Sequence, residues 1–222
     1  MPNALSRAAA IYFAAALLTF PPSPAEAQGD KQYSQPDAGH LIYAVGTIRI
    51  GMRFSFPYHR THTPDGAPVD DWNGSIRPSV GGALTLKVKN PDFQGFETGH
   101  VVIRRLPPGR YAVTDFEFAG AGAGTQTEWK SSVPFALEFT IEAGKATYIG
   151  SFMRSPTPNE QLRAELGYAG YFLIADRSER DLPIAAARLP QGIEITRQVT
   201  DVEKFGSNVL RSRSLEPAPA TP

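Results

Sequence analysis

The sequence predicts an all-β protein, a mainly antiparallel β-sandwich of about seven to nine strands with one or two short helices near the C-terminus. Three observations predict this class. Apolar and polar residues alternate with the period of two that is typical of strands, turn residues recur at short intervals, and the sequence lacks the long amphipathic helices that parallel βαβ units require between strands. We therefore expect one β domain over residues 40–211.

Residues 1–27 have the pattern of a signal peptide. Arg7 supplies a positive charge, Ala8–Phe20 is an apolar run too short for a permanent membrane span, and Ala25-Glu26-Ala27 places small residues at a cleavage site before Gln28. The alternative, an uncleaved anchor, disagrees with both the short run and the cleavage site. The chain has no cysteine to carry a lipid anchor. We expect an exported protein, periplasmic or secreted, with no integral membrane span after cleavage.

The composition excludes several classes of function. The chain has 22 basic and 22 acidic residues, so its balanced charge gives no electrostatic reason to bind nucleic acid. Because it contains no cysteine, it cannot use disulfides, cysteine-ligated zinc or iron–sulfur clusters, and its stability must come from a hydrophobic core. Neither glycine-rich segment has the residues of a phosphate-binding loop. We expect no cofactor.

The N-terminal half begins with a polar segment, residues 28–39, which we interpret as a flexible leader. From Ile42 to Phe56 the even positions are apolar or small, which predicts a long strand or a bent pair of strands with one buried and one solvated face. Gly46 or Gly51 is the expected site of a bulge. The segment Pro57–Pro78, rich in proline and turn residues, is predicted to be a long loop.

The rest of the domain is predicted to form strands joined by turns. Two short helices interrupt this pattern, the second with Asp181 as its N-cap and Pro183 in its first turn. The expected strands are Ala83–Lys89, Val101–Leu106, Arg110–Phe118, Phe135–Ile141, Ala146–Met153, Tyr171–Ala175 and Ile193–Val199; the expected helices are Pro156–Gly167 and Ser178–Leu189; Gly120–Gly124 is expected to be a flexible loop tip, and residues 212–222 a disordered tail rich in proline and alanine.

One stretch, Leu106–Met153, organises the chain. Pro107-Pro108-Gly109 has turn chemistry and precedes the strand that contains Tyr111, and Ala143-Gly144-Lys145 is a tight turn between two strands. This pattern of Pro-Gly-x-Tyr followed by Gly-Lys-x-x-Tyr resembles that of prealbumin-like or carboxypeptidase-regulatory-like β-sandwiches and of related bacterial exported proteins of unknown function. The resemblance covers Ala83–Phe152 and implies a fold; it transfers no catalytic residues.

Two groups of residues are candidates for a functional site. His59 and His62, with Asp65, are of metal-ligand type, but the prolines at both ends disfavour the helix that would bring the histidines together, so we interpret them as loop residues. Trp72 and Trp129, with Tyr58, flank the two segments that we expect to be exposed. Such aromatic residues either form a binding surface for a peptide or glycan, or cap the core.

Three hypotheses of function follow. The first is a non-enzymatic structural or interaction module of the cell envelope, with an envelope protein or a glycan as its partner. The second is a small-ligand or glycan binding protein that uses Tyr58, Trp72 and Trp129. The third is a metal-dependent hydrolase that uses His59, His62 and Asp65. We prefer the first because no nucleophile motif such as Gly-x-Ser-x-Gly occurs in the chain.

Overall fold

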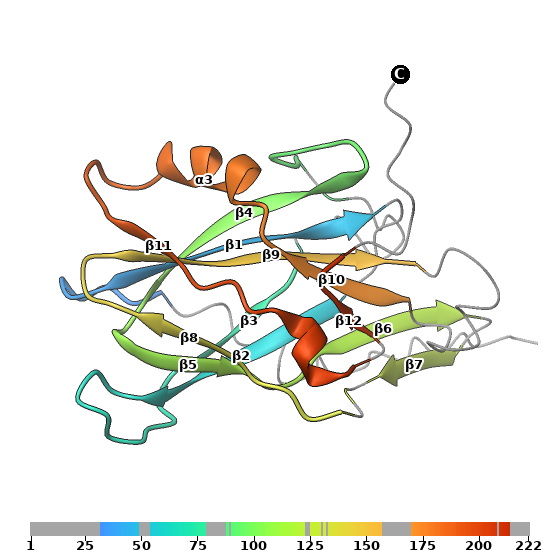
Figure 1. Ribbon diagram of the computed structural model, residues 1–222, viewed down its shortest axis with the longest axis horizontal. Coiled ribbons are helices and arrows are strands. Elements are labelled where there is room, and N and C mark those ends of the chain that lie inside the picture. Colours follow the sequence, from blue (N-terminus) through green and yellow to red (C-terminus); the bar gives the residue numbers. More distant parts are fainter. Residues whose placement is uncertain are drawn as a thin grey trace, which may run out of the picture.

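A computed structural model of the protein describes residues 32–48, 54–78, 88, 90–122, 125–129, 131, 133–156, 170–207 and 209–213. Within these residues the chain is mostly β (Figure 1). The strands are β1 (Gly39–Ile48), β2 (Phe54–His62), β3 (Asn73–Ile76), β4 (Glu97–Leu106), β5 (Gly109–Val113), β6 (Glu117–Gly122), β7 (Thr125–Trp129), β8 (Leu137–Ile141), β9 (Ala146–Ser155), β10 (Tyr171–Ala175), β11 (Ile195–Arg197) and β12 (Leu210–Arg211); the helical segments are α3 (Ser178–Ala186) and the 3-10 turn η1 (Val202–Phe205).

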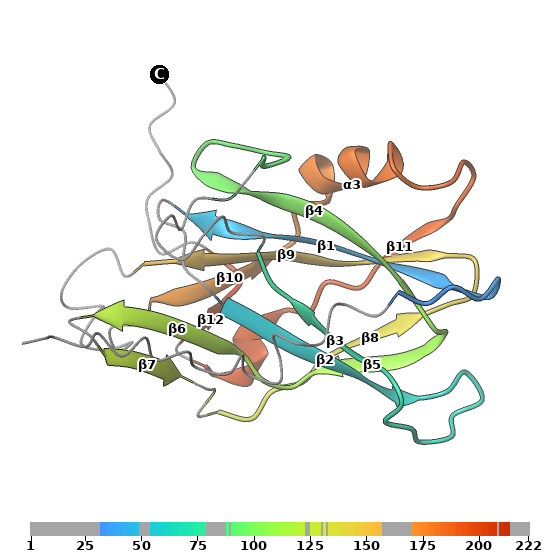
Figure 2. The same ribbon diagram turned by 180° about the vertical axis from the view of Figure 1, so that it is seen from behind.

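The described strands form two sheets of six strands each. Sheet I has the order β12-β10-β9-β1-β4, with β11 also paired to β9, and sheet II has the order β7-β6-β2-β5-β8, with β3 also paired to β2 (Figures 1 and 2). The prediction of a mostly β, mostly antiparallel protein is confirmed. The predicted seven to nine strands are too few, and sheet I is mixed, because β1 and β11 pair with β9 in parallel and β10 pairs with β12 in parallel.

The two sheets share one hydrophobic core. Strand β1 contributes Leu41, Tyr43 and Val45 from sheet I, and β2 contributes Phe54 and Phe56 from sheet II. Phe56 packs edge-on against rings from the opposite sheet, with its centroid 4.7 Å from that of Phe172 and 5.3 Å from that of Phe152. Such aromatic pairs add to the free energy gained by burying their apolar area.

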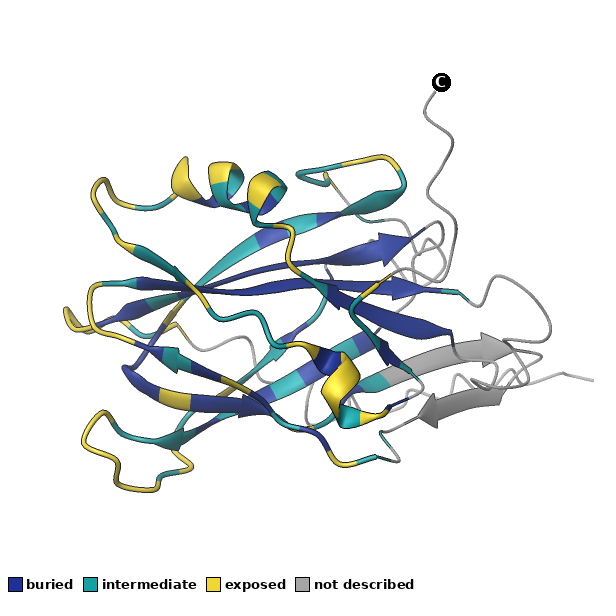
Figure 3. Ribbon diagram, viewed as in Figure 1, coloured by how far each residue is buried: buried dark blue, intermediate teal, exposed yellow. Residues whose placement is uncertain are grey.

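The outer face of sheet I carries a second core. Ile42 and Ala44 of β1 pack there together with Tyr148 of β9 and residues under α3, so β1 is buried on both faces (Figure 3). The prediction that Ile42–Phe56 has one buried and one solvated face is therefore wrong for β1. It holds for β2, where Phe54, Phe56 and Tyr58 are buried and the residues between them are partly exposed. The alternation also spans two strands that lie in different sheets.

A bulge in β9 allows this strand to supply both cores. Its pairing with β1 shifts between Ile42 and Ala44, opposite Gly150, which has a φ of 111° that favours glycine. Because of this extra residue, Tyr148 faces the outer core and Phe152 faces the core between the sheets. The bulge was predicted at Gly46 or Gly51. At Gly46 the register with β4 is unbroken, and Gly51 lies outside the described residues.

The tight turn at Ala143-Gly144-Lys145 joins the two sheets. Strand β8 pairs with β5 in sheet II, whereas β9 pairs with β1 in sheet I, so the chain crosses between sheets within this turn. Gly144 has a φ of 69°, and its N–H donates to the carbonyl oxygen of Ala38 at 3.1 Å. The turn therefore also holds the segment that leads into β1.

Helix α3 is attached to sheet I by a buried carboxylate. Asp181 is fully buried and accepts hydrogen bonds from the Tyr148 hydroxyl and from Arg180 Nε, each at 2.7 Å. Arg180 in turn pairs with Glu97 on β4. The predicted helix is confirmed, but the prediction that Asp181 is its N-cap is wrong. The N-cap is Arg177, and Asp181 lies inside the helix, where its partners are Tyr148 in the sheet below and Arg180 beside it in the helix. This anchor places residues 187–190 beside β4.

The predicted Pro107-Pro108-Gly109 turn is closed by two side chains. The Tyr111 hydroxyl donates to the carbonyl oxygen of Pro107 at 2.7 Å, and the buried guanidinium of Arg60 donates to that of Pro108 at 2.5 Å. A Cβ at Gly109 would collide with the His62 carbonyl oxygen, so a side chain does not fit there. Tyr111 thus satisfies a buried carbonyl four residues before it, as does the tyrosine corner of many β-sandwiches.

Other predictions are revised or fall outside the described residues. The predicted loop Pro57–Pro78 is too long, because β2 continues to His62 and β3 begins at Asn73; Pro57 is accommodated opposite Ser75 in this pairing. Gly120–Gly122, predicted as loop, pair with Thr125–Thr127 in the β6–β7 hairpin. The strands Val101–Leu106 and Tyr171–Ala175 are confirmed, and β12 was not predicted. The predicted strand Ile193–Val199 is shorter than expected and extends from Ile195 to Arg197.

Outside the described residues lie the signal peptide, residues 28–31 of the leader and the loop tip at residues 123–124, as well as residues 157–167 of the predicted helix, the tail from residue 214 and, apart from Val88, the predicted strand Ala83–Lys89. Within the described part of the chain, no helix is long and apolar enough to span a membrane.

Candidate functional site

Two of the three aromatic residues proposed as a binding surface, Tyr58 and Trp72, pack in or against the core. Tyr58 belongs to the core between the sheets, with its ring 6.3 Å from that of Tyr111, because it takes an inward position of β2. Trp72 is partly buried against the same core and meets the ring of Tyr33 edge-on at 5.6 Å. Trp129 pairs with Phe118 in the β6–β7 hairpin, and its side chain lies outside what the structure describes.

The residues of the metal-site hypothesis lie at the β2–β3 hairpin. His59 and His62 are in β2, and His62 Nδ1 is 3.0 Å from the Thr61 hydroxyl. Asp65 is exposed at the tip, where a hydrogen bond from the Thr63 hydroxyl lowers the pKa of its carboxyl group. Among the described residues, no three histidine, cysteine or acidic side chains converge on one point.

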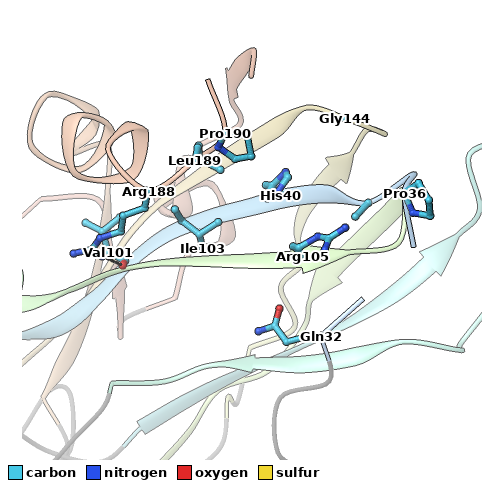
Figure 4. A pocket seen from close by; sticks show the side chains of 11 residues that line it. Gln32, Pro36, His40, Val101, Ile103, Arg105, Gly144, Arg188, Leu189 and Pro190 are labelled. Carbon is cyan, nitrogen blue, oxygen red and sulfur yellow. Dashed lines mark hydrogen bonds between the residues drawn. The ribbon is translucent and has the colours of Figure 1, made fainter. Parts of the chain in front are cut away.

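A groove at the edge of sheet I is a better candidate. It has a volume of about 750 Å³ and lies on the outer face of the sheet, beyond the residues that α3 covers (Figure 4). His40 on β1 lies on one side of β4 and Gln32 lies on the other. The lining residues come from four segments of the chain and are Gln32, Pro36, Ala38, His40, Val101, Ile103, Arg105, Gly144, Arg188, Leu189 and Pro190.

The groove exposes part of the free edge of β4. This strand ends the order of sheet I, so alternate residues direct their N–H and C=O groups away from β1. Val101 N–H donates to Asp92 Oδ2 at 2.9 Å, the Val101 carbonyl accepts from Arg188 at 3.0 Å, and the Arg105 carbonyl accepts from Tyr33 N–H at 3.2 Å. Ile103 lies between them and has the same orientation, yet no hydrogen bond from the described residues reaches its outward N–H and C=O.

Arg105 gives this site its charge. Its side chain is exposed and donates to the carbonyl oxygen of Gln35 at 3.0 Å, and no described carboxylate pairs with it. Arg188, in contrast, holds Asp92 in a two-point ion pair at 2.5 and 3.0 Å, and this hydrogen bonding lowers the pKa of Asp92. One positive charge of the groove is therefore neutralised within the fold, and the other remains.

His40 is the remaining titratable group of the groove. Burial, followed by the charge of Arg105, lowers the pKa of its imidazole, so the ring is neutral at physiological pH. Its Nδ1 atom is buried, and no described residue forms a hydrogen bond with it. The lining residues offer hydrogen-bonding groups from Gln32, His40 and the two arginines, together with apolar groups.

Sequence reasoning did not find this groove because its residues are distant in the chain. His40, Arg105 and Arg188 come from three segments that only the pairing of β1 with β4 and the anchoring of α3 bring together. No spacing in the sequence marks them. Comparison of the chain with protein-family models, with curated proteins and with solved structures finds no match. The assignment of function therefore depends on the geometry of this chain.

Proposed function

We propose that this protein is an exported, non-enzymatic binding module of the cell envelope, and that it binds its partner in the groove beside β4. The observation that carries the proposal is that one groove combines Arg105, which has no carboxylate partner among the described residues, with Ile103, whose outward N–H and C=O have no partner there either. An exposed N–H and C=O at a sheet edge can pair with an added extended segment, and a carboxylate on the partner would neutralise Arg105.

The scaffold supports this proposal. The floor of the groove belongs to β1 and β4, and β1 is buried on both faces and paired on both sides, so the site rests on a rigid element. Leu189 and Pro190 are placed by α3, whose anchor Asp181 is fully buried. A site held in this way requires little ordering of the protein on binding, which favours affinity.

We further propose that the fold is a prealbumin-like β-sandwich, as the resemblance over Ala83–Phe152 implies. The hydrogen bond from the Tyr111 hydroxyl to the Pro107 carbonyl oxygen supports this proposal. It closes the Pro107–Gly109 turn, so the proline, glycine and tyrosine of the Pro-Gly-x-Tyr pattern have a structural role. We do not extend the proposal to a metal-dependent hydrolase, because no described group of three possible ligands surrounds His59, His62 and Asp65.

A pull-down from an extract of the source cell envelope tests the proposed function. The baits are the chain from residue 28 to 222, the same chain with Arg105→Glu, and a control with Arg197→Glu, a change at an exposed arginine outside the groove. We expect a partner, identified by mass spectrometry, to be captured by the first and third baits and lost from the second. Loss from the control as well, or equal capture by all three, would contradict the proposal.

A further inference from the structure

We propose that the groove binds an extended peptide segment that carries an acidic residue, and that this residue pairs with Ile103 as one added position of sheet I. The inference rests on the proposed function and narrows it to a class of partner. It follows from three features of the groove: the backbone groups at the β4 edge, the width of the open edge, and the charge beside it.

The backbone groups favour a peptide. Ile103 directs one N–H and one C=O toward the groove, as the hydrogen bonds of Val101 and Arg105 on either side establish. In an antiparallel pair, one residue exchanges both of its backbone bonds with one residue opposite. An amino-acid residue matches this pair of groups, whereas a carboxylate or phosphate, which only accepts hydrogen bonds, matches the N–H alone.

The open edge is short. Asp92 and Arg188 cover the edge at Val101, and the backbone of Tyr33 covers it at Arg105. The distance between these two covers is four residues, roughly 14 Å of extended strand. The groove therefore accepts a short segment with one central residue opposite Ile103 and cannot accept a long added strand.

The charge selects an acidic side chain at that central position. Residues directly opposite in a sheet direct their side chains to the same face, so the side chain of the bound residue lies on the groove face with Ile103 and Arg105. Arg105 has no described carboxylate partner, and a carboxylate on the bound segment would supply one. The residue two positions further along directs its side chain to the same face, on the side of Leu189, which favours an apolar side chain there.

Amide hydrogen exchange measured by NMR on the chain from residue 28 to 222 tests the inference. The probe is acetyl-Ala-Glu-Ala-Leu-amide. The free protein should exchange the Ile103 amide rapidly, since this N–H points away from β1, and saturating probe should slow the exchange at least about fivefold. An Ile103 amide that is already protected in the free protein would overturn the inference, because the edge would then be covered.

Two altered probes and one protein variant separate the contribution of the backbone hydrogen bonds to binding from that of the charge. The same peptide with a methyl group on the glutamate nitrogen should not protect Ile103, because it cannot donate to the Ile103 carbonyl. The peptide with glutamine in place of glutamate, and the Arg105→Gln variant with the original peptide, should each bind at least about fivefold more weakly. The Arg197→Gln control should bind the original peptide as the unaltered chain does.

The remaining outcomes decide between ligand classes. Equal binding of the N-methylated peptide, or tighter binding of acetate or of a galacturonic acid disaccharide than of the peptide, would overturn the inference in favour of an anion or glycan site. If the Arg105→Glu bait loses its envelope partner in the pull-down but no peptide binds, the proposed function stands and this inference fails. If the peptide binds but no partner depends on Arg105, the proposed function fails.

Discussion

The two sheets differ in what covers their outer faces. Strands β1 and β9 of sheet I are buried on both faces, because α3 and the segments next to it form a second core on the outer face of the sheet (Figures 1 and 3). Strands β2 and β8 of sheet II alternate between buried and more exposed residues. The comparison teaches that period-two alternation reports a solvated face, so it identifies the strands of an uncovered sheet better than those of a covered one.

The groove lies where the cover of sheet I ends. Ile42 and Ala44 of β1 lie in the outer core with α3, whereas His40, before them in β1, lines the groove. On β4, Val101 belongs to both the core and the groove, and Ile103 and Arg105 line the groove. The outer face of sheet I is thus covered over most of β1 and exposed at the groove, where the paired strands β1 and β4 carry accessible polar groups. If this difference between the sheets is correct, loss of the contact that attaches α3 to sheet I should destabilise the protein most.

Replacing Asp181 by alanine should have the largest effect. The change leaves the Tyr148 hydroxyl and Arg180 Nε without their buried acceptor, and we expect the free energy of unfolding to fall by about 3 kcal/mol. Urea denaturation measures this value. Glu179→Ala in the same helix is the control, because Glu179 is exposed, and it should change stability by less than about 0.5 kcal/mol. Equal effects would mean that Asp181 does not anchor the helix.

Replacing Tyr111 by phenylalanine should have a smaller effect, within sheet II. The ring and its stacking on Phe139 remain, but the buried carbonyl of Pro107 loses its donor, so we expect a loss of about 1.5 kcal/mol. Thermal unfolding measures it. Tyr33→Phe removes a similar hydroxyl bond, to Asp37, at an exposed site and should cost less than about 0.5 kcal/mol. A Tyr111→Phe chain as stable as the original would show that the turn does not need this bond.

The smallest expected effect is a pH dependence at His40. Its folded pKa lies below the unfolded value of 6.5, so the unfolded chain binds the proton more readily. The stability that neutral His40 contributes is fully present above the unfolded pKa and is lost as the pH falls through the folded pKa. Between about pH 7.5 and pH 5.5, the original chain should therefore lose more stability than a His40→Gln variant.

NMR titration of the imidazole provides a second measurement of the same effect. Because the charge of Arg105 is one cause of the lowered pKa, Arg105→Gln should raise the pKa of His40 toward its ordinary value. Saturation with an acidic peptide should also raise it. An unchanged pKa in the variant would show that Arg105 does not act on this ring.

The sequence predicted the β class because most strands have a local signal. Alternation located β2, the apolar run Tyr171–Ala175 located β10, and turn chemistry located the boundaries of β5 and β9. The sequence did not predict which sheet each strand joins, because neighbours in the chain can belong to different sheets. Strands β8 and β9 are an example.

The roles of single residues were predicted less well. Asp181 has the sequence context of a helix cap, but its partners, Tyr148 below it and Arg180 beside it, make it an anchor. The groove could not be predicted, because it requires the pairing of β1 with β4 and the position of the segment after α3.

The parallel pairing of β1 with β9 has a consequence for the order in which the protein can assemble. β1 is made first among the described strands, and its partner β9 follows roughly a hundred residues later. β4 is synthesised between them and can pair with β1 earlier, as one half of an incomplete sheet. Until β9 is synthesised, β1, which is buried on both faces in the folded protein, keeps an open edge, and such an edge favours aggregation of the incomplete chain.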